Sequence, residues 1–172
     1  SAFVVQCGGY TVVTDPVWSD FASPVQFAGP KRMVPVPVPL DDLPKIDIVT
    51  ISHNHYDHLD TATVKALFKR WNPIFVVPFG MKKWFASFRC STRFDLERVV
   101  ELHWWQEVTI GRHANGSVEM FQSPQELHHH ASDSHEAFRA KFLNGQSLVR
   151  ITATPVQHWS MRTGLDRYME QW

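Results

Sequence analysis

Cysteine is scarce in this sequence: the 172 residues contain two, Cys7 and Cys90, which lie far apart. This spacing argues against a disulfide framework and indicates a reducing, intracellular compartment. An excess of positive charge is also missing, because 17 Lys and Arg balance 17 Asp and Glu. A chain without a basic excess is poorly suited to hold a polyanion, so we expect no nucleic acid partner.

Long apolar runs are missing too. No segment approaches the roughly 18 consecutive apolar residues that a membrane-spanning helix needs. The hydrophobic fraction of 44% and the aromatic fraction of 13% are nevertheless those of a globular protein, long enough for one domain with a sizeable core. The sequence begins with Ser, so we treat both ends as cut and leave a targeting segment upstream open.

The most informative stretch follows an apolar, β-branched run at residues 46–51, which predicts a buried strand. Directly behind this run stands the sequence Ser-His-Asn-His-Tyr-Asp-His. Residues two apart point the same way in extended backbone, so His53 and His55 are placed to bind one ion together. Asp57 and His58 follow as the chain turns into a helix. Imidazole and carboxylate are ligands that Zn²⁺ accepts, and the alternative, a polar loop with local hydrogen bonds, explains this spacing less well.

Patterning around this stretch predicts a strand–helix–strand unit, with the ligands at the carboxyl end of its first strand. Asp60 is a suitable N-cap for a helix over 61–71, whose apolar residues recur on one face, and Asn72-Pro73 ends it. Two β-forming segments around Gly8-Gly9 predict a hairpin. Further strands are predicted at 74–77, 98–102, 108–110 and 147–154, and a second short helix at 80–88.

Two segments lack such patterning. Residues 23–45 are rich in proline, which denies the backbone its donor and predicts an extended loop. Within it, Lys31-Arg32 is either a solvated pair or faces a phosphate. Residues 111–146 are rich in small polar residues and predict a polar surface segment. Its triplet His128–His130 is expected to be exposed, with adventitious metal binding as the alternative.

The pattern His-x-His-x-Asp-His resembles the signature of the metallo-β-lactamase superfamily. Several stretches, in the same order, resemble more narrowly its N-acylphosphatidylethanolamine-hydrolysing phospholipase D family. These stretches are Thr14–Ser19, Ala22–Arg32, Ile51–Asp60, Trp104-Trp105, Thr154–Trp159 and Arg162-Thr163. The resemblance implies an α/β fold, the αββα sandwich, of which residues 1–172 supply roughly the first half. The family has a much shorter connection at residues 111–146, so the resemblance also implies that this segment is a polar surface insertion.

The resemblance also implies the roles of individual residues and two Zn²⁺ ions in the full-length protein. One ion is held by His53, His55 and His158, and the other by Asp57 and His58, which are also the catalytic residues. Asp15, at a strand end before proline, is either a turn residue or supports the metal histidines from behind. Tyr56 either contacts substrate or packs beneath the loop. A bridging aspartate and a last histidine are not found before Trp172, so we expect a partial domain, inactive alone and with a bare apolar face on its first sheet.

The function implied is a phospholipase D that releases N-acylethanolamine and phosphatidic acid. A phospholipid substrate and peripheral membrane contact follow from it, with a peripheral membrane or cytoplasmic location and a homodimer left open. Two other interpretations remain. One is a different hydrolase on this scaffold, acting on a lactone, thioester or nucleotide phosphodiester. The other is a non-catalytic module with a single structural zinc ion.

Overall fold

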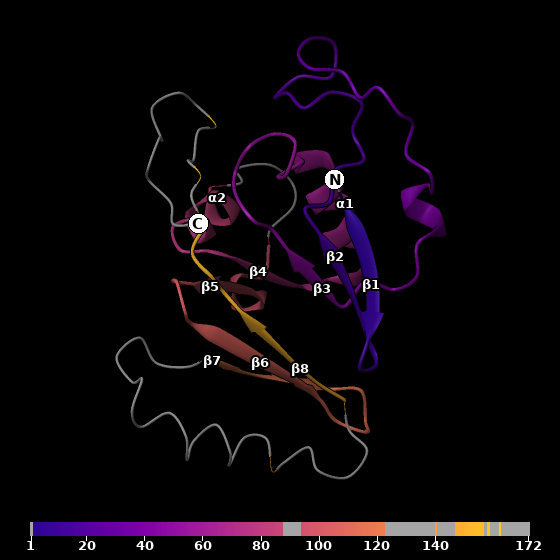
Figure 1. Cartoon of the computed structure of the whole chain (residues 1–172). Helices are drawn as coiled ribbons and strands as arrows, with labels where there is room; N and C mark the ends of the chain where they lie inside the picture. Colours follow the sequence, from indigo (N-terminus) through magenta and orange to yellow (C-terminus); the bar gives the residue numbers. More distant parts are fainter. Residues whose placement is uncertain are drawn as a thin grey trace.

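The computed structural model describes residues 2–87, 94–122, 140, 147–156, 158 and 162 (Figure 1). These residues form two β-sheets and two α-helices. The first sheet contains, in spatial order, β1 (Phe3–Cys7), β2 (Tyr10–Thr14), β3 (Ile48–Thr50), β4 (Ile74–Pro78) and β5 (Val99–Leu102). The second contains, in the order β7-β6-β8, β6 (Glu107–Arg112), β7 (Val118–Gln122) and β8 (Ser147–Thr152). The helices are α1 (Thr61–Trp71) and α2 (Lys82–Ala86), with short 3₁₀ helices η1 (Leu40–Asp42) and η2 (Leu96–Arg98).

Strand direction decides where the site lies. β1 and β2 form the predicted antiparallel hairpin, whose turn uses Gly8 and Gly9 at φ of 54° and 79°. From β2 to β5 every pairing is parallel, so the carboxyl ends of four strands meet at one edge of the sheet. Loops that leave this edge are the usual place for a site in α/β sheets.

The predicted helix at 61–71 is confirmed at both ends. The Asp60 side chain accepts a hydrogen bond from the Ala62 backbone N–H, and Asn72 closes the helix in the left-handed conformation, with φ of 46°. Val64 and Leu67, on the inner face of this helix, are fully buried. The second helix is shorter than predicted, because α2 ends at Ala86.

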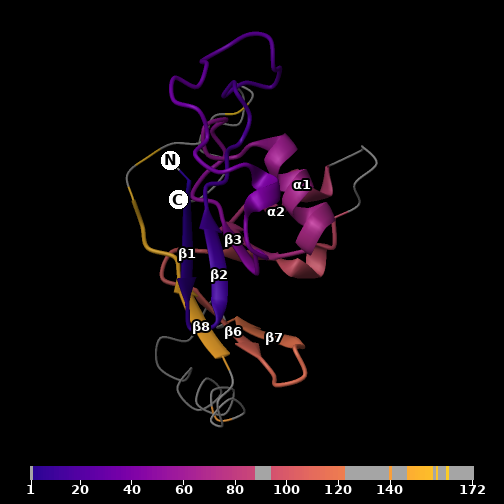
Figure 2. The same ribbon diagram turned by 90° about the vertical axis from the view of Figure 1, so that its right-hand side faces the viewer.

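Alternation along the strands gives the first sheet two apolar faces. One face packs Val13, Val49, Phe75 and Val99 against the helices. The opposite face packs Tyr10, Ile48, Ile74, Val76, Val100 and Leu102 against the second sheet. The result is a layer of helices, a layer of mixed sheet and a second sheet (Figure 2). This arrangement confirms the α/β class and matches three layers of an αββα sandwich.

The expected bare apolar face was wrong. Val108 and Ile110 of β6 are fully buried against the first sheet, so the chain supplies strands of both layers. Only β1 agrees with the expectation, since all five of its residues are exposed. The short apolar run at 108–110 predicts a strand but carries no local signal for the sheet against which this strand packs.

Part of the predicted polar insertion at 111–146 is regular structure. Residues 111–112 complete β6, and Val118–Gln122 form β7, joined by a turn in which the Gly116 N–H donates to the His113 carbonyl. Asn-Gly between apolar residues is a strong hairpin signal, and Asn115-Gly116, with Gly116 at φ of 84°, supplied it. Residues 123–146, apart from Ala140, lie outside the described residues, as do Phe88, Cys90 and the triplet His128–His130.

None of the helices in the described part of the chain is long and apolar enough to cross a bilayer.

Candidate metal centre

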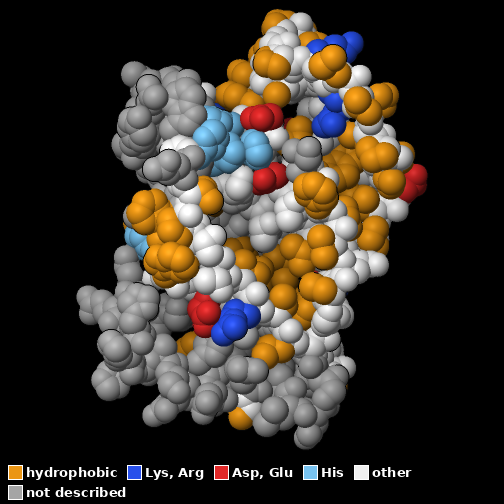
Figure 3. All heavy atoms as spheres, viewed as in Figure 1, with side chains coloured by type: hydrophobic (Ala, Val, Ile, Leu, Met, Phe, Trp, Pro, Cys, Tyr) orange, Lys and Arg blue, Asp and Glu red, His pale blue; other side chains and the backbone are white. Residues whose placement is uncertain are grey.

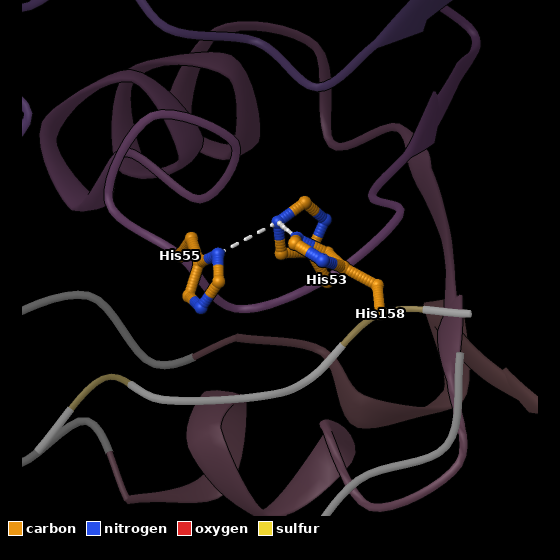
Figure 4. A group of neighbouring side chains, drawn as sticks. All are labelled: His53, His55 and His158. Atoms are coloured by element: carbon orange, nitrogen blue, oxygen red, sulfur yellow. Dashed lines mark hydrogen bonds between the residues drawn. The ribbon is translucent and has the colours of Figure 1, made fainter. Parts of the chain in front are cut away.

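Three histidines converge at the carboxyl-end edge of the first sheet. His53 and His55 come from the loop behind β3, and His158 comes from the segment behind β8 in the other sheet (Figure 4). His53 Nε2 lies 3.0 Å from His55 Nδ1 and 3.1 Å from His158 Nε2. All three ligand nitrogens lie within 4.8 Å of one another.

This geometry fits a metal ion. Nitrogens about 2.0–2.1 Å from a tetrahedral zinc ion stand about 3.3–3.4 Å apart, close to the separations observed. A hydrogen-bond network explains the arrangement less well. His53 Nε2 faces two other ring nitrogens at once, and one ring nitrogen can donate at most one hydrogen.

Hydrogen bonds with Ser52 and Asp15 determine which ring nitrogen of His53 carries the hydrogen. Ser52 Oγ donates its single hydrogen to Asp15 Oδ2 at 2.9 Å, because a carboxylate only accepts. The same oxygen lies 2.8 Å from His53 Nδ1 and is left to accept the ring N–H. His53 Nε2 therefore carries a lone pair directed at the shared point, which is the form a metal requires.

Electrostatics favours the same form. Burial, as the main cause, lowers the pKa of His53 from its ordinary value of 6.5 to about 3, and the neighbouring histidine rings add to this effect. Asp15 acts in the opposite direction without reversing it. The ring stays neutral at physiological pH and is ready to bind a cation.

Asp57 and His58 stand beside this cluster and not within it. His58 Nδ1 lies 2.9 Å from Asp15 Oδ2, so this nitrogen carries the hydrogen, and in the neutral ring His58 Nε2 carries a lone pair. Asp57 Oδ2 lies 3.5 Å from His58 Nε2, with the Asp57 side chain 67% exposed. The two side chains thus offer two ligand atoms near one point, and their predicted role at a second ion stays a prediction.

Asp15 has a position that fits its predicted supporting role. Its carboxylate contacts His58 directly, reaches His53 through Ser52, and accepts the Ser52 backbone N–H at 2.7 Å. The backbone at Asp15 is left-handed, with φ of 43°, which aspartate tolerates better than most residues. Ser52 was not singled out from the sequence, although it stands directly before the first histidine.

Arg162 is a second residue that the sequence analysis did not assign a role. Its guanidinium donates to the carbonyls of Asn54 and Leu59, at 2.9 and 2.8 Å, and to Thr61 Oγ1. It also lies over the Tyr56 ring, 4.0 Å from the ring centroid. One face of Tyr56 is therefore packed, in agreement with the packing role left open for it, and its contact with substrate stays a prediction. The signal available in the sequence was the position of Arg162, four residues after His158.

Asp60 connects the metal loop to the chain behind β2. Besides capping α1, its Oδ2 accepts the backbone N–H groups of Trp18 and Ser19, at 3.2 and 2.9 Å, and the Thr63 hydroxyl. Burial raises the pKa of this carboxyl, but the hydrogen bonds from Thr63, Ser19 and Ala62 outweigh burial and lower it below its ordinary value.

A cleft of about 610 Å³ runs along β5. Its lining residues come from β5, β6, β7 and the segments that follow β4 and β5, and include Phe79, His103 and Met120. None of the three convergent histidines lines it. We therefore place the chemistry at the histidines, where ligand atoms converge.

The fold and the histidine cluster define a domain of the metallo-β-lactamase type with a candidate metal site. The sequence model of the family described as the beta-lactamase superfamily domain matches residues 10–172, and the chain belongs to this family.

Three relatives are similar to this chain. The mitochondrial N-acyl-phosphatidylethanolamine-hydrolyzing phospholipase D of Saccharomyces cerevisiae is 30% identical over 95% of this chain and 27% of its own length. N-acyl-phosphatidylethanolamine-hydrolyzing phospholipase D 1 of Caenorhabditis elegans is 45% identical over 59% of this chain and 28% of its own length. An uncharacterized protein of Mycobacterium tuberculosis is 44% identical over 64% of this chain and 28% of its own length. The chain thus spans little more than a quarter of each relative.

Proposed function

We propose that the protein is a zinc-dependent phosphodiester hydrolase, a phospholipase D that releases N-acylethanolamine and phosphatidic acid from N-acylphosphatidylethanolamine. The observation that carries the hydrolase is the convergence of His53, His55 and His158, with the lone pair of His53 Nε2 fixed by Ser52 and Asp15. The choice of substrate rests on the names of the yeast and nematode relatives.

In this proposal His53, His55 and His158 hold one zinc ion, and Asp57 and His58 hold another. When bound, two such ions lower the pKa of water towards neutrality and neutralise negative charge on a phosphodiester. Asp15 keeps the ring hydrogens on the far nitrogens of His53 and His58 and so orients both rings. No nucleophilic side chain is needed.

The decisive experiment uses the protein expressed from its complete gene. Metal analysis is expected to give two zinc ions per chain. In the proposed reaction water attacks the phosphorus and the ethanolamide oxygen leaves. Hydrolysis of N-acylphosphatidylethanolamine in ¹⁸O-water is therefore expected to place the label in phosphatidic acid. Label in the ethanolamide would contradict this attack.

The same preparation separates the competing hydrolases. Phosphatidylcholine, a lactone, a thioester and a cyclic nucleotide serve as parallel substrates. Faster turnover of any of the last three would retain the metal hydrolase and reject the phospholipase. Tight binding of a single zinc ion without turnover of any substrate would support a structural zinc site.

The location follows the same proposal. A lipid substrate places the protein at a membrane surface as a peripheral protein, and the printed name of the yeast relative assigns that protein to mitochondria.

A further inference from the structure

The loop between β2 and β3 exposes apolar side chains to an unusual degree. We call residues 20–39 the proline loop. Met33 is 96% exposed, Phe27 84% and Val34 73%, and Val38 and Val25 are exposed by 41% and 37%. Single exposed apolar side chains are ordinary on protein surfaces, but a concentration of this kind marks an interaction site.

The proline loop is a built structure. The Ala22 N–H donates to the Pro30 carbonyl at 2.9 Å, and the Arg32 N–H donates to the Asp20 carbonyl at 2.6 Å. The Arg32 guanidinium donates to the carbonyls of Val17 and Ser19, which fixes the base of the loop. With its backbone held in this way, the loop keeps its apolar side chains out of the core.

Charge distinguishes this surface from an ordinary apolar patch. The proline loop contains Lys31 and Arg32, and its one acidic residue is Asp20 at its first position. Lys31 is exposed and lies over the Phe21 ring, 5.9 Å from its centroid, within the apolar segment. Apolar side chains interspersed with cations suit a phospholipid surface, where acyl chains and phosphate groups lie within a few ångströms of each other.

The proline loop also lies close to the metal centre. It leaves the same edge of the first sheet as the histidine loop, and its base is bound to Asp60 through the N–H groups of Trp18 and Ser19. It extends beyond the two sheets (Figure 1). In the surface view, its apolar and basic side chains cover the end of the molecule next to the histidines (Figure 3).

We propose that the proline loop docks the protein on a phospholipid bilayer. Phe27, Met33 and Val34 enter the interface and Lys31 meets the lipid phosphates. The inference rests on the proposed function, because a site that cleaves a phospholipid must lie at the membrane surface. A second copy of the chain, or another segment of the same protein, is the competing occupant.

The test is sedimentation of the protein, expressed from its complete gene, with phosphatidylcholine vesicles. Phe27→Ser combined with Met33→Ser is expected to lower the partition coefficient at least about tenfold, since each side chain contributes apolar area. Phe3→Ser removes a side chain that is 64% exposed on β1 and is the matched control, expected to stay within about twofold of the parent protein. Unchanged partition of the loop variant, or an equal loss in both variants, would overturn the proposal.

A charge pair tests the same surface. Phosphatidylglycerol in the vesicles should strengthen binding. In Lys31→Glu this increase in binding should be about fivefold smaller than in the parent protein. Lys69→Glu makes the same change of net charge on the exposed side of α1 and should keep the gain. Equal losses in both variants would reduce the effect to net charge and reject a role for Lys31. Light scattering on all variants tests the competing occupant. If the loop variant lost an oligomer and still bound vesicles, the proline loop would contact a second copy of the chain and not the bilayer, and the proposal would fail.

Vesicle binding and catalysis are read separately. His55→Ala is expected to bind vesicles like the parent protein while losing turnover. If N-acylphosphatidylethanolamine is not cleaved but the loop variant still loses vesicle binding, only the proposed function fails. If the lipid is cleaved and the loop variant binds normally, only the role of the loop fails.

Discussion

Two loops leave the same edge of the first sheet and differ in which side chains they bury and which they expose. The metal loop, residues 52–60, turns polar groups inward: His53 is 6% exposed, and Asn54 and Asp60 are buried too. The proline loop turns apolar groups outward, with Met33 96% exposed. Both arrangements reverse the usual distribution and would cost free energy in a loop that served only as a connection. The difference indicates that one loop is built to hold a cation and the other to meet an apolar surface.

The largest expected effect comes from removing a ligand of the metal loop. His55→Ala should lower phosphodiester turnover about 1,000-fold, equivalent to about 4 kcal/mol, together with zinc content. His113→Ala changes a histidine of the β6–β7 turn that pairs with Glu119, and serves as control. Metal analysis and turnover of the two variants decide the point, and a similar loss in both would show that the effect is not specific to the cluster.

Asp60 joins the two loops, so its removal should loosen both. Asp60→Ala is expected to lower the free energy of unfolding by about 2–4 kcal/mol, because it removes the cap of α1 and the acceptor of the partly buried Ser19 N–H. The Trp18 N–H loses one of its two acceptors and keeps Thr63 Oγ1. Asp95→Ala removes the cap of η2, where Asp95 is exposed, and should cost less than about 1 kcal/mol. Urea unfolding gives both values.

The pH dependence of this effect has a definite sign. The pKa of Asp60 is lowered in the folded chain, so its stabilisation is present above its ordinary value of 3.8 and is lost as the pH falls below it. The difference between Asp60→Ala and the parent chain should therefore be constant near neutral pH and shrink in acid. A difference that grew on acidification would contradict the hydrogen-bonded carboxylate.

We expect Asp15 to support the metal loop without binding the ion itself. Asp15→Asn keeps a residue that tolerates the left-handed backbone but removes the charge that orients His53 and His58. Zinc affinity is expected to fall about 10–100-fold. For Ser52→Ala the expected loss is about tenfold, because this variant breaks the link to His53 and a longer contact to His58 but keeps the direct contact between Asp15 and His58. Competition with a chelator measures both. A larger loss for Ser52→Ala than for Asp15→Asn would argue against this order of contacts.

The smallest expected effects compare two arginines that each hold one loop. Arg162 donates to the carbonyls of Asn54 and Leu59 in the metal loop, and Arg32 to those of Val17 and Ser19 below the proline loop. Arg162→Met should weaken zinc binding about tenfold, since charged hydrogen bonds contribute about 1.5–3 kcal/mol when well buried and less here. Arg32→Met should leave zinc affinity within about twofold and speed proteolysis in the proline loop. Equal zinc losses would mean that the loops are not independent.

Much of the first sheet followed from local patterning. Helix α1 was predicted at both ends because Asp60, the apolar stripe and Asn72-Pro73 are signals within a few residues of one another. β7 was missed because the polar composition of the surrounding residues outweighed the Asn115-Gly116 turn signal. β7 pairs with β6, which is its neighbour in sequence. The burial of β6 itself depends on packing against β2, β3 and β4, which lie far away in the chain.

The amino-acid sequence by itself determined the ligand types and their place at a strand end, because His53 and His55 follow closely on the apolar run that forms β3. Only the tertiary structure decided that His158, 105 residues from His53, reaches the same point. The two segments follow strands of different sheets, and no local interaction sets the position of one relative to the other. Burial of the apolar layer between the sheets fixes it, and with it the distance between the imidazoles.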